Sequence, residues 1–413
     1  MRSPLFFLLA LSLFGLQTHS FAAINLELTQ GVDSALPIAI LPFAGEPVTD
    51  KNGQQMTEVI QADLQNSGRF KLLEAKADYV VTGKIEPVSG HHYKVEFKLM
   101  DSVTKNAPSE LITQHYTVEA SQLRRLAHRI SDIIYEQLMG EKGVFSTHIA
   151  YVLVQRTGRI AHYSLEVADI DGVNPHPLLT SKQPIMSPAW SPDGRHLAYV
   201  SFEGNRASIY NEDINTGTRY ILASYGGVNG APAWSPDARK LALVLSKDGN
   251  PKIYSLDLAS KSLTQLTRGF SLDTEPSWLP DGRSLLFTSN RGGNNPQIYR
   301  LNLGSDSIER ISFSGDYNAT ASVDKRGLRI AMLRGERGRY NIAVQDLKKG
   351  RFRVLTDSGM DESPSIAPNG SMVVYATKYK GRGVLGMVST DGRVKLRLPA
   401  REGDVQGPAW SPL

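Results

Sequence analysis

The amino-acid sequence predicts a six-bladed β-propeller preceded by a small α/β domain. A short motif recurs about every 44 residues, strand-like segments follow each copy, and the two ends of the repeat region complement each other. The third motif position falls at residues 190, 234, 278, 323, 366 and 410, so the steps are 44, 44, 45, 43 and 44. The clearest copies begin at Pro188, Pro232 and Pro276 and read Pro-x-Trp-x-Pro-Asp.

Each repeat predicts one blade of four strands. The Asp-Gly pair that ends a full motif favours a tight turn, because glycine accepts a positive φ and aspartate bonds to the nearby backbone. A second strand follows each turn, at residues 197–200, 241–244, 285–288, 330–333 and 373–376. Segments such as 253–257 and 263–267 predict the third and fourth strands. The recurring aspartates Asp193, Asp237 and Asp281 are therefore interpreted as turn residues.

The ends of the repeat region predict how the ring closes. The last copy, residues 408–412, contains a first strand alone, whereas residues 148–180 contain three strands and lack the first. We therefore expect residues 408–412 to complete the first blade, so that five whole blades and one composite blade make six. Such closure removes the exposed sheet edge of an open repeat array.

A different kind of sequence precedes the repeats. Residues 37–43, 70–73, 79–85, 93–99 and 114–118 read as strands, and helical spacing of apolar residues occurs over 56–64 and 123–138. Ser67-Gly68 and Gly140 are expected to end the two helices. The predicted domains are thus a mixed-sheet α/β domain with two helices at 23–140, a linker at 141–147 and the propeller at 148–413.

The N-terminus predicts export. Arg2, an apolar run over residues 5–16 and the segment Ser20-Phe21-Ala22 resemble a signal peptide of residues 1–22, cut after Ala22. The run is too short for a comfortable membrane span. The chain contains no cysteine, so an N-terminal lipid-modified cysteine is excluded.

Composition and motifs argue against several functions. The net charge of +5 comes without a basic run, so nucleic-acid binding is not expected. The Gly381–Gly386 segment fits G-x-G-x-x-G but lies in a predicted blade turn, and His91-His92 is interpreted as part of a hairpin turn. We find no nucleophile elbow and no phosphate loop, and we expect no catalytic residues, no cofactor and no metal ion.

The whole chain resembles the TolB family, periplasmic components of the Tol–Pal system of Gram-negative bacteria. The resemblance depends on the repeat and on Gly31-Val32-Asp33-Ser34, residues 184–190, Asp273-Thr274-Glu275-Pro276 and residues 388–393. Two segments depart from the family pattern: Val323, Lys325 and Arg326 replace the aromatic residue and the Pro-Asp pair, and residues 226–230 are Gly-rich.

The resemblance implies a binding protein. In such proteins the propeller binds the peptidoglycan-associated lipoprotein Pal, and the segment after the signal peptide binds the C-terminal domain of TolA. The system supports outer-membrane integrity and envelope constriction at cell division, and some colicins use the same propeller mouth.

The Pal site is expected where loops enter the innermost strands and line one mouth of the channel. Turn formation is the alternative reading for each of these residues, and we weight Thr274 and Glu275 most. The expected Pal-binding residues are Met186, Ser187, Asn229, Gly230, Thr274, Glu275, Asn318, Ala319, Glu362 and Ser363.

The TolA site is expected just after the signal peptide. The segment alternates apolar and polar residues and so can add a strand to a partner's sheet, or it can form an edge strand of its own α/β domain. The expected TolA-binding residues are Ile24, Asn25, Leu26, Glu27, Leu28, Thr29, Gly31, Val32, Asp33 and Ser34.

Two other classes of function are weighed against this reading. Similar propellers gate the active sites of prolyl-oligopeptidase-type serine peptidases, but here the N-terminal domain is small and lacks the nucleophile motif. A periplasmic propeller that binds a sugar or another small ligand would use the same central funnel. Protein partners in an envelope extract, or small molecules alone, would discriminate these classes.

Overall fold

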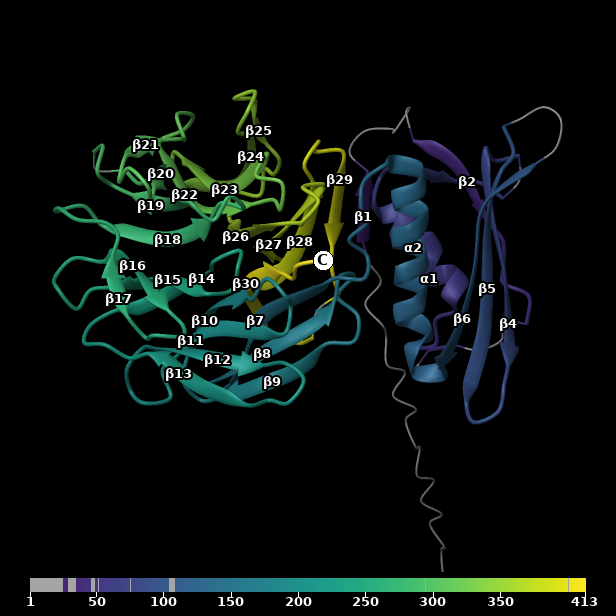
Figure 1. Ribbon diagram of the computed structural model, residues 1–413, viewed down its shortest axis with the longest axis horizontal. Coiled ribbons are helices and arrows are strands. Elements are labelled where there is room, and N and C mark those ends of the chain that lie inside the picture. Colours follow the sequence, from purple (N-terminus) through teal and green to yellow (C-terminus); the bar gives the residue numbers. More distant parts are fainter. Residues whose placement is uncertain are drawn as a thin grey trace, which may run out of the picture.

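A propeller and a smaller α/β unit lie side by side in the computed structural model (Figure 1). Residues 25–28, 35–45, 49–50, 52–74, 76–103, 108–293, 295–399 and 401–413 are described. The predicted signal peptide and its cleavage site lie outside these ranges.

The α/β unit contains the expected mixed sheet. Its five strands lie in the order β3-β2-β4-β5-β6, with β2 parallel to β3 and β4 and the remaining neighbours antiparallel. The strands are β2 (Leu36–Ile40), β3 (Phe70–Leu72), β4 (Tyr79–Pro87), β5 (His92–Asp101) and β6 (Ser109–Glu119).

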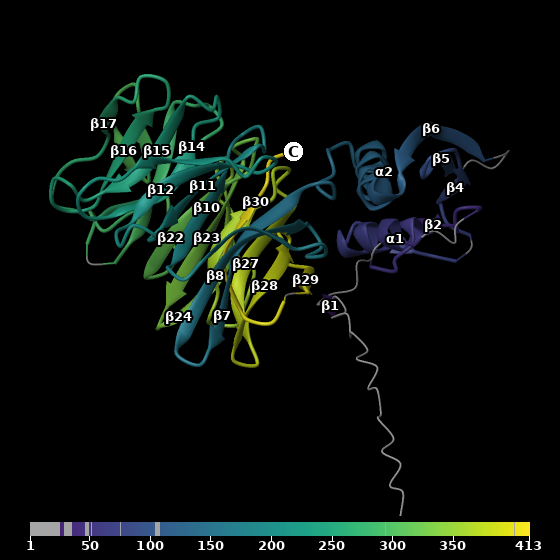
Figure 2. The same ribbon diagram turned by 90° about the horizontal axis from the view of Figure 1, so that it is seen from below.

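Two helices cover the sheet on the side that faces the propeller (Figures 1 and 2). These are α1 (Met56–Asn66) and α2 (Leu123–Met139), the latter preceded by the short 3₁₀ helix η1 (Ala120–Gln122). Apolar residues at helical spacing, among them Ile60 and Ile130, are fully buried against the sheet. Gly140 ends α2 in the left-handed conformation, at φ 71°, as the sequence predicts.

The propeller consists of six antiparallel sheets, one per repeat. We number the blades in chain order, and blade 1 contains both the first and the last propeller strands. Blade 1 contains β7 (His148–Thr157), β8 (Ile160–Asp169), β9 (His176–Ser181) and β30 (Asp404–Trp410). Blade 2 contains β10 (Ile185–Trp190), β11 (His196–Ser201), β12 (Ser208–Asp213) and β13 (Arg219–Ala223). Blade 3 contains β14 (Asn229–Trp234), β15 (Lys240–Leu245), β16 (Lys252–Asp257) and β17 (Leu263–Gln265).

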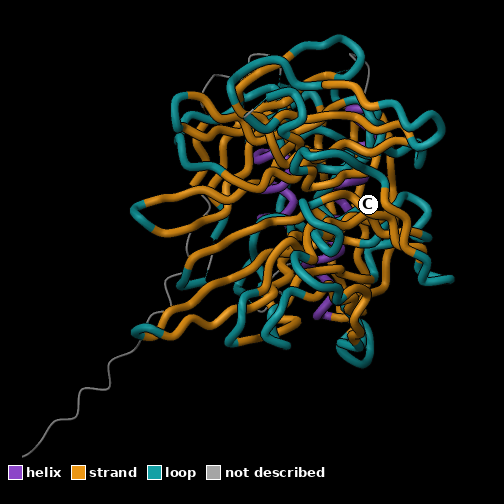
Figure 3. Tube along the Cα trace, turned by 90° about the vertical axis from the view of Figure 1, so that its left-hand side faces the viewer, coloured by secondary structure: helices purple, strands orange, loops and turns teal. Residues whose placement is uncertain are grey.

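The other three blades follow the same order of strands, and Figure 3 shows the propeller with the helices of the α/β unit behind it. Blade 4 contains β18 (Asp273–Trp278), β19 (Ser284–Ser289), β20 (Gln297–Asn302) and β21 (Ile308–Arg310). Blade 5 contains β22 (Tyr317–Val323), β23 (Arg329–Glu336), β24 (Arg339–Asp346) and β25 (Phe352–Val354). Blade 6 contains β26 (Glu362–Ile366), β27 (Met372–Tyr379), β28 (Arg382–Ser389) and β29 (Val394–Arg397).

The repeated tryptophans connect neighbouring blades. The indole Nε1 of Trp190 donates a hydrogen bond to Ala409 O at 3.0 Å, in the innermost strand of the preceding blade. Trp234 donates to Ala189 O at 3.2 Å, and Trp278 to Ala233 O at 3.1 Å. The second strands supply the apolar core between blades, as with Leu197, Leu241 and Leu285.

The motif aspartates form turns, as predicted. The Ser191 hydroxyl donates to Asp193 Oδ1 at 2.5 Å and lowers the pKa of that carboxyl group, while Arg195 N donates to the same oxygen. Ser235 and Asp237 make the equivalent hydrogen bond at 2.6 Å in the next blade. The aspartate therefore recurs in successive repeats because it accepts hydrogen bonds within the turn.

The C-terminal strand closes the ring, which confirms the predicted composite blade. β30 pairs antiparallel with β7, from Asp404 opposite Val154 to Trp410 opposite Ile149. The strand begins at Asp404, four residues earlier than the expected segment. Trp410 is 7% exposed, and its indole Nε1 donates to Thr147 Oγ1 at 2.8 Å.

The N-terminal strand pairs with the propeller. β1 (Asn25–Leu28) adds antiparallel to β29, with Asn25 opposite Arg397 and Leu28 opposite Val394. Figures 1 and 2 both show β1 between the propeller and the α/β unit. The alternative that this segment is an edge strand of the α/β domain is therefore wrong. The outer edge of blade 6 presents backbone hydrogen-bonding groups that β1 can satisfy.

Removing the closing strand should destabilise the propeller. We expect a chain that ends at Gly407 to melt at a markedly lower temperature or to aggregate, because truncating one buried Trp alone costs about 3–5 kcal/mol. The deletion also removes the hydrogen bond from Ser411 N to His148 O. Thermal unfolding followed by circular dichroism measures the effect. The control lacks Leu413 alone, which is 45% exposed; equal melting temperatures for both truncations would contradict ring closure by β30.

Candidate functional site

A cavity of about 750 Å³ lies along the propeller axis, lined by the innermost strands of all six blades. We call the end where these strands begin the entry face. The opposite end, with the turns that join first to second and third to fourth strands, is the exit face.

One residue in each innermost strand has a left-handed backbone. A register shift interrupts the pairing there in every blade, so each strand carries a bulge. Positive φ is unfavourable for residues other than glycine, which indicates that the surrounding blade imposes it. All six residues line the cavity: Ser187 (φ 54°), Ala231 (43°), Glu275 (52°), Thr320 (52°), Ser363 (51°) and Gly407 (54°).

Five of the predicted Pal-binding residues line the cavity. Met186 is 45% exposed, Ser187 and Glu362 are also exposed, and Glu275 and Ser363 are half-buried. Gly230 and Thr274 are half-buried in neighbouring positions of β14 and β18. The structure thus brings most of the predicted set to the entry face.

Three predicted residues are buried, so their side chains are not presented at the surface. Asn229, Asn318 and Ala319 are 1%, 0% and 1% exposed. Asn229 Nδ2 donates to Tyr225 O at 2.7 Å, and Tyr225 N donates back to Asn229 Oδ1 at 2.9 Å. Asn318 Nδ2 donates to Gln297 Oε1 at 2.9 Å. These two amides shape the loops that lead into β14 and β22.

The same repeat position is an aspartate in two other blades. Asp273 is fully buried and binds Lys252 and Arg291, and Asp361 is 3% exposed. Burial raises the pKa of Asp273, but the hydrogen bonds that its carboxylate accepts from Ser289 and Arg291, together with the charge of Arg291, outweigh burial and lower the pKa. Periodic recurrence of Asn or Asp at 229, 273, 318 and 361 was the available signal for a structural role.

Glu275 joins two blades. Its carboxylate accepts hydrogen bonds from Thr320 N and Thr320 Oγ1, both at 2.9 Å, and from Thr288 Oγ1 at 2.7 Å. The Glu275 carboxylate of blade 4 therefore accepts hydrogen bonds from Thr320, the residue of blade 5 with the left-handed backbone. A substitution of Glu275 changes the blade contact as well as the surface charge.

Exposed apolar side chains surround the entry face. They lie in the loops that join a fourth strand to the next blade, or at the start of a first strand. Sequence reasoning missed most of them, although a large apolar residue beside Gly and Ser in a predicted loop is a usable signal. The exposed fractions are 45% for Met186, 48% for Val228, 98% for Phe270, 46% for Leu272, 74% for Phe313 and 61% for Met360.

The predicted TolA-binding segment is described in part. Asn25, Leu26, Glu27 and Leu28 form β1, whose register pairs Glu27 with Lys395. Ile24, Thr29, Gly31, Val32, Asp33 and Ser34 lie outside the described residues.

The α/β unit and the linker that follows it contact the exit face. Asn52 Nδ2 donates to Asn174 Oδ1 at 2.9 Å, and Asn369 Nδ2 donates to Lys142 O at 2.9 Å. Gly68, at the end of α1, lies against Val394: a Cβ atom on this glycine would approach Val394 Cγ2 to 2.3 Å. The α/β unit therefore touches the same strand, β29, that pairs with β1.

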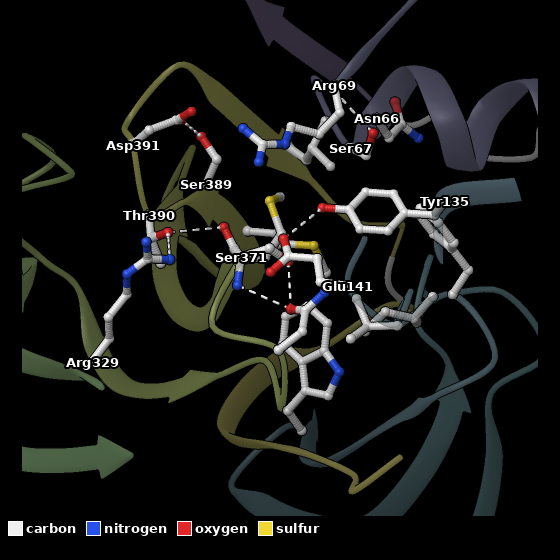
Figure 4. A pocket seen from close by; sticks show the side chains of 18 of the residues that line it. Asn66, Ser67, Arg69, Tyr135, Glu141, Arg329, Ser371, Ser389, Thr390 and Asp391 are labelled. Carbon is white, nitrogen blue, oxygen red and sulfur yellow. Dashed lines mark hydrogen bonds between the residues drawn. The ribbon is translucent and has the colours of Figure 1, made fainter. Parts of the chain in front are cut away.

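A second cavity, of about 430 Å³, lies between the two bodies (Figure 4). Arg69 and Tyr135 line it from the α/β unit, and Arg329 and Thr390 line it from the propeller. Glu141 in the connection between the bodies accepts a hydrogen bond from Tyr135 Oη at 3.3 Å. Burial raises the pKa of Tyr135 to about 12, so its hydroxyl remains protonated at neutral pH.

A cluster of charged groups also joins the two bodies beside this cavity. Arg124 of α2 contacts Asp169, the last residue of β8, and Asp171 in the following turn of blade 1. Burial lowers the pKa of His128, but the neighbouring Asp63 carboxylate outweighs burial and raises the pKa to about 9.

Among the described residues, no helix is long and apolar enough to cross a membrane.

Comparisons with known proteins agree with this architecture. Residues 135–413 match the model of the TolB beta propeller domain, and residues 24–77 match that of the TolB amino-terminal domain. The chain is 50% identical over 434 residues to the Tol-Pal system protein TolB of Coxiella burnetii, covering 100% of this chain and 98% of the relative. It is 52% identical over 411 residues to that of Legionella pneumophila strain Paris, covering 96% of each. The crystal structure of TolB from Acinetobacter baumannii superposes with a TM-score of 0.85 at 39% identity, covering 95% of this chain and 100% of that one.

Proposed function

Because this chain belongs to the TolB family of Tol–Pal system proteins, we propose that it is a periplasmic binding protein with two separate protein-binding regions. Its entry face binds Pal, and its N-terminal segment binds the C-terminal domain of TolA. Through these contacts it supports outer-membrane integrity and envelope constriction at division. It acts by binding and catalyses no reaction.

The exposed apolar side chains of the entry face are the observation that best supports the Pal proposal. Phe270, Phe313 and Met360 are all more than half exposed, in loops of successive blades. Clusters of large exposed apolar residues on a soluble protein are typical of interaction surfaces. A standard interface buries about 1,600 Å² in total, which requires several such loops together.

The edge position of β1 supports the TolA proposal. β1 pairs with β29 on one side and is the outermost strand of its sheet. A short edge strand can leave its own sheet and add to the sheet of a partner, where backbone hydrogen bonds give affinity. Docking on β29 then competes with TolA, because a partner that binds the released state must overcome the docking free energy.

A small-ligand-binding propeller remains the alternative. The axial cavity of about 750 Å³ falls in the size range of small-molecule sites. A small-ligand-binding function predicts that substitutions inside the channel change the affinity for the ligand, and that substitutions on the surrounding loops leave this affinity unchanged.

A charge reversal on the entry face should weaken Pal binding. Glu362 is exposed and lines the mouth of the cavity, whereas Glu275 also joins two blades, so Glu362→Lys changes the surface more selectively. We expect at least a tenfold increase in the Kd for the periplasmic domain of Pal, measured by calorimetry, with an unchanged melting temperature.

The matched control for this measurement is Glu110→Lys, an exposed residue on β6 of the α/β unit. It should bind Pal like the parent. Equal affinities for Glu362→Lys and Glu110→Lys would argue against the entry face as the Pal site, as would an effect of Glu110→Lys alone.

The N-terminal segment should be required for TolA binding. Deleting residues 23–34 is expected to abolish capture of the TolA C-terminal domain and to leave Pal affinity at least as high. A reversible lock tests the docked state: the pair Glu27→Cys and Lys395→Cys places two cysteines opposite each other in a chain that has no other.

The oxidised double-cysteine protein should fail to bind TolA, and reduction should restore binding. Each single-cysteine variant serves as a control for the substitutions themselves. TolA capture at parental affinity by the oxidised protein, or by the deleted one, would refute the assignment of this segment.

A further inference from the structure

The cluster between α2 and blade 1, in which Asp50, Asp169 and Asp171 are half-buried, has an excess of negative charge. Arg124 is 5% exposed, and its guanidinium contacts Asp50 at 3.1 Å, Asp169 at 3.1 Å and Asp171. Three carboxylates thus face one guanidinium. Burying uncompensated charge is costly, so this arrangement favours a further cation.

His128 places an unused ring nitrogen in the same cluster. The residue is 3% exposed, and its Nδ1 donates to Asp63 Oδ2 at 2.8 Å. Its Nε2 is buried and has no hydrogen-bond partner among the residues that the structure describes. Buried polar atoms are nearly always paired in folded proteins, so an orphaned nitrogen in this position needs an explanation.

Three side chains beside Arg124 have donor atoms close enough to one another to bind one metal ion after a small movement. Donor atoms of His128, Asp169 and Asp171 all lie within 4.8 Å of one another. His148 Nε2 lies 3.9 Å from Asp169 Oδ1. His128, His148 and Asp169 line a cavity of about 150 Å³, together with Arg124 and Arg125, and this volume has room for an ion.

We propose that this cluster is a divalent transition-metal site of the zinc type, formed by His128 Nε2, Asp169 and Asp171, with His148 as the fourth ligand. Imidazole nitrogens with carboxylate oxygens are ligands that zinc accepts in four-coordinate sites. The Asp63–His128 hydrogen bond is the carboxylate–histidine arrangement that orients a metal-binding imidazole. The ion takes the place of the proton on Nε2.

Binding requires a small rearrangement. Zinc bonds to nitrogen and oxygen measure about 2.0–2.2 Å, so tetrahedral ligand atoms lie about 3.3 Å apart. Donor atoms that lie up to 4.8 Å apart must therefore approach one another by up to about 1.5 Å. The His148 side chain is 43% exposed and can turn toward Asp169. The ion must share Asp169 and Asp171 with the Arg124 guanidinium, which contacts both. The other contacts of Arg124, with Asp50 and Gln54, lie outside the ligand set.

The site would join the two bodies of the molecule. His128 belongs to α2 of the α/β unit, whereas His148, Asp169 and Asp171 belong to blade 1 or its β8–β9 turn. An ion bound to both sides stabilises the folded interface, because a ligand of the folded state alone raises the melting temperature.

Zinc titration of the mature protein, residues 23–413, tests the proposal. We expect one Zn²⁺ per chain with a Kd below about 10 μM, a higher melting temperature, and a Co²⁺ absorption spectrum typical of four-coordination. His148→Ala and His128→Gln should each weaken Zn²⁺ binding at least tenfold, and Asp63→Asn should weaken it through loss of imidazole orientation. His115→Ala, a half-exposed histidine of β6, is the matched control.

His148→Ala decides the question if His128→Gln does not fold, since His148 is the more exposed ligand. The proposal is overturned if the parent shows no saturable Zn²⁺ binding below about 100 μM. It is equally overturned if His148→Ala binds Zn²⁺ like the parent, or if His115→Ala loses binding to the same extent.

Discussion

The antiparallel pairing of β30 with β7 is the contact on which the rest of the propeller depends. Indole-to-carbonyl hydrogen bonds such as Trp190 to Ala409 join blades 2, 3 and 4 to the preceding blade, and the apolar second strands pack between blades. Because the last strand completes the first blade, the six innermost strands surround one axial cavity. Their entry loops are thereby held on one face, where a partner can contact several blades together.

The two ends of the propeller have different neighbours. The α/β unit packs on exit-face turns through contacts such as Asn52 with Asn174, while the entry face presents exposed apolar side chains such as Phe270. Strand β29 has two neighbours from the N-terminal part of the chain: β1 pairs with it, and Gly68 of the α/β unit packs against its Val394. The α/β unit and the N-terminal segment thus contact the same strand of blade 6.

Local and periodic features of the chain were predictable from sequence, including the pairing of the two ends of the repeat region. Contacts outside the repeat pattern were not. The repeat predicted six blades and their closure, and Gly140 predicted the end of α2. Periodicity could not tell that Asn229 and Asn318 are buried loop-forming residues, because a surface loop and a buried loop share the same turn chemistry. Two further features depend on how the α/β unit packs against the propeller. They are the pairing of β1 with a propeller sheet and the cluster of Arg124 and His128 with Asp169. No spacing along the chain records that packing.

Amide hydrogen exchange, measured with and without the periplasmic domain of Pal, tests most directly the claim that a closed ring presents one binding face. The account predicts slower exchange in the entry-face loops at residues 225–230, 268–275, 313–319 and 357–363. Exchange in the exit-face turns at residues 193–195, 237–239 and 281–283 should stay the same. Protection confined to those turns or to the α/β unit would contradict it.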